Sequence, residues 1–216
     1  SVSVYLHEAF GKKWLSVGIG LAMVAAGITS AATLAKGFAG YLSVLLPAPE
    51  LLASIGLLVV LGLIAAKGIG ESAKLAGIFT LIEVAGLLLV VFVGRASLVQ
   101  VDIGKLLTID PAVGLSGLIG GTFLAFYAFI GFEDMVNIAE ETKNPQRTMP
   151  LAILISLLVS TVLYLLVAIV AITAVTPAEL ASSKAPLSLV YSQASGGSAL
   201  FLTIIGISAA VNGVIV

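Results

Sequence analysis

Glu83 is the residue whose position in this chain most directly suggests chemistry. It is the one charged residue of the apolar run Leu75–Gly94, with eight residues before it and eleven after it. An ionised carboxylate facing lipid at such a depth is costly, so this side chain must face a helix bundle, a partner or water. Two interpretations remain open: a site that carries a proton or a cation, or a neutral glutamic acid hydrogen-bonded to a neighbouring helix.

A second candidate site lies in residues 120–135, where glycines, aromatic residues and two acids come together. The uncharged stretch 122–132, as a helix, would cover about half of a ~30 Å hydrocarbon layer. Glu133 and Asp134 follow at a depth where a continuous lipid-facing helix would not place them. The pattern predicts a broken helix, with a first half that ends near Ile130 and a second half that begins near Phe132. Backbone groups without helical partners at such a break can hold the charged ends of a substrate.

The candidate substrate-binding residues surround this break, and their aromatic rings would supply the wall or lid of a cavity. They are Tyr127, Phe129, Ile130, Gly131, Phe132 and Glu133, with Phe123 and Phe126 in the same aromatic cluster. The alternative is that the helix simply ends at Phe132 and that both acids lie in the membrane interface.

Other kinds of chemistry find little support in the residues. Gly114–Gly117 has the G-x-S-G form of intramembrane serine proteases, but that mechanism needs a histidine base, and the only histidine is His7. No cysteine is present, and His7 has no second histidine to form a metal pair. Ten Lys and Arg against eleven Asp and Glu exclude the basic patch of a nucleic-acid binder. We therefore expect neither an enzyme nor a bound metal or cofactor. Asn212 and Ser208 are interpreted as interhelical hydrogen-bonding residues.

The elements that must position these residues are membrane-spanning helices. The chain has 216 residues, of which 60% are hydrophobic and 10% charged, and its mean hydropathy is +1.21. Its uncharged runs approach or exceed the roughly 20 residues that cross a bilayer as a helix. The sequence predicts an all-α polytopic membrane protein with six spans, at about 14–35, 51–66, 75–94, 118–140, 151–173 and 198–216.

The connections between these spans indicate an orientation. Those at 11–13, 67–74 and 142–149 carry six Lys and Arg, whereas the opposite side carries four, so we expect the first set in the cytoplasm. We expect Pro150 in the first turn of the fifth span, with Thr148 as its cap, and a short helix at Pro186–Tyr191. Because the chain opens without Met and stops inside an apolar run, it is interpreted as an internal piece of a longer protein.

Three stretches of the sequence carry a family resemblance. Phe129–Glu133, followed by Ala139–Pro150 with its Glu-Glu-x-Lys-Asn-Pro-Gln-Arg pattern, resembles the sixth-helix and loop signature of the amino acid–polyamine–organocation permeases. Gly70–Lys74 and Ile78–Glu83 resemble the start of that family's fifth helix, and Tyr5–Gly11 resembles its approach to helix three. The resemblance implies family helices three to eight of a LeuT-like fold of two inverted five-helix repeats.

The resemblance also implies roles for the candidate residues. The break at Ile130–Glu133 would contribute backbone groups to the substrate, Tyr127 would occupy an aromatic gating position, and Glu83 would lie at a coupling site. Family helices one and two are absent from these 216 residues, and helix one supplies half of the family's substrate site.

The expected function is secondary active transport of amino acids or related amines across the plasma membrane, driven by protons and without a cofactor. The expected partners are a small-molecule substrate and the lipid bilayer, with no nucleic acid. The alternatives are a carrier of inorganic ions with the same architecture and a membrane scaffold subunit that transports nothing.

Overall fold

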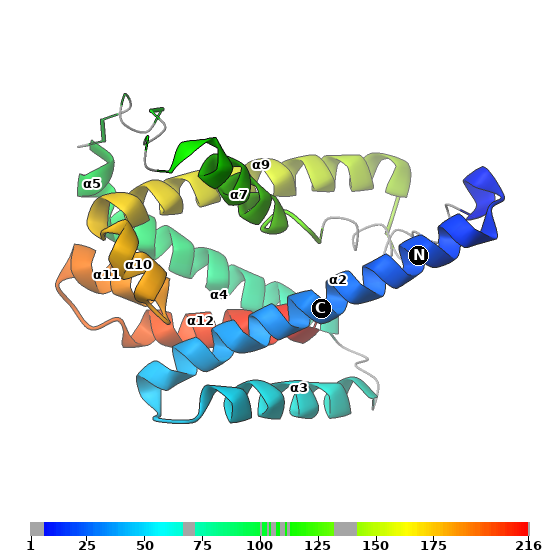
Figure 1. The fold of residues 1–216 in the computed structure, drawn as a ribbon, viewed down its shortest axis with the longest axis horizontal. Coiled ribbons are helices and arrows are strands. Elements are labelled where there is room, and N and C mark those ends of the chain that lie inside the picture. The colour runs from blue at the N-terminus through cyan, green and yellow to red at the C-terminus, as the bar shows by residue number, and fades with distance from the viewer. Residues whose placement is uncertain are drawn as a thin grey trace.

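The fold is all-helical in the part of the chain that the structure describes. The structure is a computed structural model, and it describes residues 7–66, 72–99, 101–102, 104, 107–108, 111, 113–131 and 142–215. Within these ranges every regular element is a helix and no strand is present, which confirms the predicted all-α class. Figure 1 shows long helices in layers, with short helices gathered at one end.

Each predicted span coincides with a helix over all or part of its described residues. The helices are α2 (Lys13–Leu45), α3 (Glu50–Ala66), α4 (Ser72–Val93), α5 (Arg95–Val99), α7 (Gly114–Tyr127), α9 (Pro145–Ala174), α10 (Pro177–Ser182), α11 (Pro186–Ser195) and α12 (Leu200–Ile215). Both α2 and α9 are long and apolar enough to cross a membrane, and α3, α7, α12 and the 77–93 part of α4 are shorter apolar helices. The number of spans therefore stays a prediction.

Two helices, α2 and α9, are longer than the spans predicted from the positions of charged residues. The first does not stop at Lys36 but continues to Leu45, because Ala35, Ala39 and Gly40 are buried against neighbouring elements. A lysine does not end a helix, since its apolar stem can lie along the helix while its ammonium group reaches water.

The fifth predicted span begins earlier than expected. Here α9 starts at Pro145, which takes the first-turn position, while Pro150 lies inside the helix. Thr148 is not its cap, because its hydroxyl donates to the Lys143 carbonyl at 2.9 Å. Asn144 precedes the helix with φ of 53°, a left-handed conformation that asparagine tolerates better than most residues.

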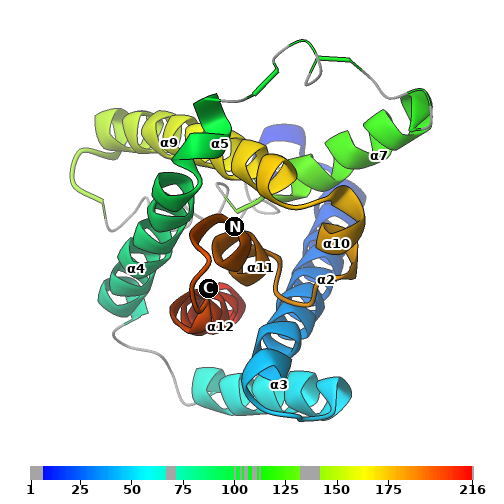
Figure 2. The same ribbon diagram turned by 90° about the vertical axis from the view of Figure 1, so that its left-hand side faces the viewer.

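The central helix of the bundle is α12. It contacts α2, α3, α4 and α11, and Figure 2 shows it inside the ring formed by α2, α3, α4 and α9. Its buried residues are Leu202, Thr203, Ile205, Ala210 and Asn212. By contrast α3 lies at the periphery, with most of its large apolar side chains exposed.

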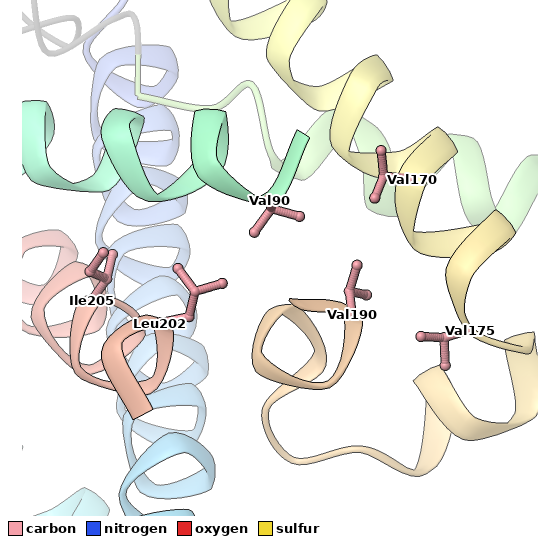
Figure 3. Packing of buried hydrophobic residues seen from close by; sticks show 6 residues of the cluster. All are labelled: Val90, Val170, Val175, Val190, Leu202 and Ile205. Atoms are coloured by element: carbon pink, nitrogen blue, oxygen red, sulfur yellow. The ribbon is translucent and has the colours of Figure 1, made fainter. Parts of the chain in front are cut away.

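The buried core joins four helices near the end where α5, α10 and α11 gather. Its residues are Val90 on α4, Val170 on α9, Val175 after it, Val190 on α11, and Leu202 and Ile205 on α12. Figure 3 shows these side chains facing one another across the space between the helices. Among apolar helices in lipid, association depends on close van der Waals packing of this kind.

The α10–α11 connection is ordered by local bonds and by one ion pair. Thr176 and Glu179 form a capping box at the start of α10, and the hydrogen bonds from Thr176 lower the pKa of the Glu179 carboxyl. The expected helix at Pro186–Tyr191 is confirmed as part of α11. Lys184, between the two helices, pairs with Glu50 at the start of α3. The ion pair therefore ties this connection to the α2–α3 corner.

Gly40 provides the closest backbone contact to this connection. A Cβ atom at residue 40 would lie 2.6 Å from the Lys184 carbonyl oxygen, whereas one at Gly37, a turn earlier on α2, would meet nothing within 4 Å. We expect Gly40→Ala to destabilise the protein by about 1–3 kcal/mol, because a backbone carbonyl must move. Thermal melting of the purified intact protein measures the effect. The matched control Gly37→Ala should be neutral or stabilising by up to about 1 kcal/mol, and equal melting of the two variants would contradict the contact.

Candidate functional site

The end of α7 is the candidate substrate site. The helix Gly114–Tyr127 has 14 residues, which at about 1.5 Å per residue is shorter than the ~30 Å apolar layer of a membrane. After Tyr127 the chain forms a turn over residues 128–131. Successive amides of this turn donate to carbonyls three residues earlier, as in Ile130 N to Tyr127 O at 3.2 Å. The α-helix therefore tightens into a 3₁₀-like turn and stops within an apolar stretch.

Gly131 marks the end of this turn. Its φ of 122° lies in a region that L side chains rarely adopt, and a Cβ atom there would meet nothing within 4 Å. Glycine is thus required by the backbone conformation and not by lack of space. Phe132, Glu133 and Asp134 lie outside the described residues, so the second half of the predicted broken helix and the roles of its acids stay predictions.

The carbonyl groups of residues 125–128, at the end of α7, have hydrogen-bond partners. The carbonyls of Ala125, Phe126 and Tyr127 accept from the amides of the turn at 3.0–3.2 Å. The next carbonyl, that of Ala128, accepts from the Tyr164 hydroxyl of α9 at 3.0 Å. Helix-end carbonyls are commonly satisfied by such tightened turns or by side chains.

Two neighbouring helices hold the turn in place. The Tyr127 hydroxyl donates to Ser30 Oγ on α2 at 3.0 Å. The ring of Phe129 packs edge-on against Tyr164 on α9, with centroids 5.2 Å apart and ring planes at 72°. The turn is thus bonded to α2 through Tyr127 and contacts α9 through Phe129, and Figure 2 shows α7 at the edge of the bundle.

Sequence reasoning did not identify Ser30 or Tyr164 as part of this site. A signal for Ser30 was present, because Gly18, Ala22 and Ala26 precede it at four-residue intervals and so lie on one face of α2. Tyr164 carried no such signal, since nothing in the sequence pairs it with residue 128.

The aromatic residues do not act as one group. Tyr127 and Phe129 are anchored to α2 and α9, whereas Phe123 and Phe126 of α7 are 74% and 64% exposed. Ile130, at the tip of the turn, is 49% exposed. The role of these rings as the wall of a substrate cavity stays a prediction.

Glu83 belongs to a different pair of helices. It lies near the middle of α4, and its Oε1 accepts a hydrogen bond of 2.9 Å from Asn212 Nδ2 on α12. Asn212 is buried, and its expected role as an interhelical hydrogen-bonding residue is confirmed. The structure thus supports one element of the second interpretation of Glu83, a bond to a neighbouring helix. Within the described ranges, no three His, Asp or Glu side chains gather in a way that could hold a metal ion.

Comparison with known proteins identifies the class of protein. The family profile described as "Amino acid permease" matches residues 1–216. The chain therefore belongs to the amino acid permease family, and it is part of an integral membrane protein. This confirms the resemblance drawn from Phe129–Glu133 and Ala139–Pro150.

Individual relatives agree with this assignment. The chain is 33% identical over 153 residues to cationic amino acid transporter 9, chloroplastic, of Arabidopsis thaliana. This alignment covers 71% of this chain and 25% of the relative. It is 29% identical over 221 residues to the branched-chain amino acid permease BcaP of Lactococcus lactis subsp. cremoris (strain MG1363). That alignment covers 92% of this chain and 46% of the relative. The chain thus spans less than half the length of each. Both relatives are named as transporters or permeases and not as enzymes.

The turn after α7 can be tested at Gly131. We expect Gly131→Ala to lower thermal stability, because alanine at a φ of 122° is strained by about 1–3 kcal/mol. Thermal melting of the intact protein measures the effect. Gly121→Ala is the control, since it lies on α7 without a positive φ and with open space at its Cβ. Equal behaviour of the two variants would show that the turn is not needed.

Proposed function

We propose that this chain is the middle part of a secondary active transporter that moves amino acids or related amines. The observation that carries the proposal is the end of α7 at Tyr127, inside an apolar stretch and bound to α2 and α9. Helix ends at mid-membrane are what transporters use to hold charged substrate groups. Support for the substrate class comes from relatives whose names specify cationic and branched-chain amino acids.

In this proposal the substrate lies beside the turn that follows α7. The proposed backbone contacts come from Ile130 and Gly131, at the end of that turn. Tyr127 takes the gating position, where its bond to Ser30 would break or form as α7 moves relative to α2. Phe129 contributes the ring that Tyr164 orients. Phe132 and Glu133 complete the proposed contact.

Glu83 is the proposed proton-coupling group. A glutamic acid side chain accepts a hydrogen bond in both its neutral and its ionised form, and the Asn212 amide is a donor in either case. The carboxyl can therefore gain or lose a proton without losing its partner on α12. Because α12 is the central helix of the bundle, a change of charge at Glu83 acts on an element that contacts α2, α3, α4 and α11.

The driving force in this proposal is the proton gradient alone, and no resident cofactor takes part. We propose the plasma membrane as the location, although relatives include transporters named chloroplastic and vacuolar. If the protein were instead a membrane scaffold subunit that transports nothing, the fourth predicted span would be a continuous helix through residue 131. The end of α7 at Tyr127 and the φ of Gly131 do not favour it.

Proton coupling is tested by Glu83→Gln in the intact protein. The amide cannot carry a proton but keeps a side chain of the same shape, so gradient-driven accumulation should fall to the level seen without a gradient. Exchange of labelled for unlabelled substrate should persist, because it needs no net proton movement. Uptake and counterflow in proteoliposomes with an imposed pH gradient measure both activities.

The matched control is Glu179→Gln, which makes the same chemical change in the exposed capping box of α10. It should leave both activities unchanged. Accumulation by Glu83→Gln with the wild-type dependence on pH would refute the coupling role. Loss of both accumulation and exchange would instead assign Glu83 a structural role.

A further inference from the structure

Tyr164 of α9 makes two contacts with the turn that follows α7. Its hydroxyl donates to the backbone carbonyl of Ala128 at 3.0 Å. Its ring packs edge-on against the ring of Phe129, with centroids 5.2 Å apart. The two contacts fall on consecutive residues, one on the backbone and one on a side chain. Together they fix the place of the turn beside α9 and the direction in which Phe129 points.

The hydrogen bonds within the turn hold it only weakly. The amides of residues 128, 129 and 130 donate to carbonyls three residues earlier at 3.0–3.2 Å, and bonds of this 3₁₀ type have poorer geometry than those of an α-helix. Gly131 follows with a φ of 122°, and glycine loses more conformational freedom on ordering than any other residue. The turn therefore depends on contacts from outside to keep one conformation.

Helix α9 offers a firm support for these contacts. Tyr164 lies in the second half of this 30-residue helix. The preceding residue, Leu163, is 8% exposed, and Val170 is fully buried in the core shared with α4, α11 and α12. Because hydrogen bonds run along the whole helix backbone, core packing at these residues also holds the backbone of Tyr164. Tyr164 thus connects the turn to the core of the bundle.

The hydroxyl of Tyr164 acts on the backbone of the turn itself. The bond between Tyr127 and Ser30 holds a side chain, whereas the Tyr164 hydroxyl bonds a backbone carbonyl. Within an apolar layer, a carbonyl group that loses its donor has no water to replace it, so the loss is costly. Removal of the hydroxyl would therefore loosen the backbone of the turn while the ring still orients Phe129.

We propose that Tyr164 is a positioning residue of the transport site, which sets the affinity for substrate through the turn and does not touch the substrate. Its hydroxyl keeps residues 128–131 in the conformation to which the substrate binds. Without the hydroxyl that conformation is populated only part of the time, and the apparent affinity falls by the populated fraction. The inference rests on the proposed function, because it assigns a determinant of affinity to the same site.

The first test is Tyr164→Phe in the intact protein, which keeps the ring and removes only the donor. Uptake of labelled leucine or arginine into proteoliposomes, whichever the wild type accumulates, gives a half-saturation concentration and a maximal rate. The half-saturation concentration should rise about tenfold, which corresponds to one net hydrogen bond. The maximal rate should change little, because saturating substrate selects the ordered turn. A lower maximal rate with an unchanged half-saturation concentration would overturn the inference, since it would leave Tyr164 a structural role only.

Two tyrosine analogues test the donor itself. At residue 164, 4-aminophenylalanine keeps an N–H group at the same point of the ring, whereas 4-methoxyphenylalanine keeps the oxygen but has no proton to donate. The first should restore the wild-type half-saturation concentration, and the second should do no better than Tyr164→Phe. Restoration by both analogues would overturn the role of the donor, and so would a failure of the amino analogue to improve on Tyr164→Phe.

Two further variants serve as matched controls. Thr161→Val removes a hydroxyl from α9 three residues earlier, where its bond of 2.7 Å to the Leu157 carbonyl stays within the helix. Tyr191→Phe removes the same phenol oxygen from α11, at a partly buried side chain beside the core. Both should keep the wild-type half-saturation concentration and maximal rate, and thermal melting checks that each variant is folded. An equal rise in either control would overturn the inference, because the effect would not be specific to residue 164.

Hydrogen exchange separates this inference from the proposed function, because it requires no transport. In the intact protein without substrate, the amides of residues 128–130 should exchange faster in Tyr164→Phe than in the wild type and in both controls. Faster exchange in a protein without gradient-driven uptake would support the effect on the turn and count against the proposed function alone. Normal uptake with unchanged exchange and an unchanged half-saturation concentration would overturn the inference and leave the proposed function intact.

Discussion

A carboxyl group in the middle of an apolar helix must find its hydrogen-bond partner inside the protein. Glu83 meets this requirement through Asn212, and the bond fixes α12 beside α4. With α12 in that place, Leu202 and Ile205 reach the core shared with α9 and α11. The central helix is thus held by this polar contact, by the bond between Thr203 and Ser188 of α11, and by close apolar packing.

The side of α12 that faces α2 is packed through small residues. A Cβ atom at Gly206 would lie 2.6 Å from the Tyr41 ring of α2, and one at Gly213 would lie 3.0 Å from Leu34. Small residues let the two helices approach closely, and van der Waals contact then takes the place of hydrogen bonds. Family membership places this bundle in a membrane, where such packing is the main attraction between helices.

The same requirement for internal partners applies to the backbone at the end of α7. A helix that stops among apolar neighbours leaves carbonyl groups that cannot turn to water. Three of them are satisfied by the tightened turn, and Tyr164 reaches the fourth from α9. The bond from Tyr127 to Ser30 adds α2 to the same assembly. The turn is therefore connected to two long helices, α2 and α9.

The sequence by itself determined the class of the protein and the positions of its helices, because long uncharged runs can satisfy their backbone only as helices. It also indicated that the fourth run is interrupted near Gly131, since glycine and acids there do not suit a continuous lipid-facing helix. Only the tertiary structure decided that Asn212 is the partner of Glu83, 129 residues away in the chain, and that Ser30 and Tyr164 anchor the turn. Helix formation depends on neighbouring residues, whereas these contacts depend on how distant helices pack. No local pattern specifies that packing.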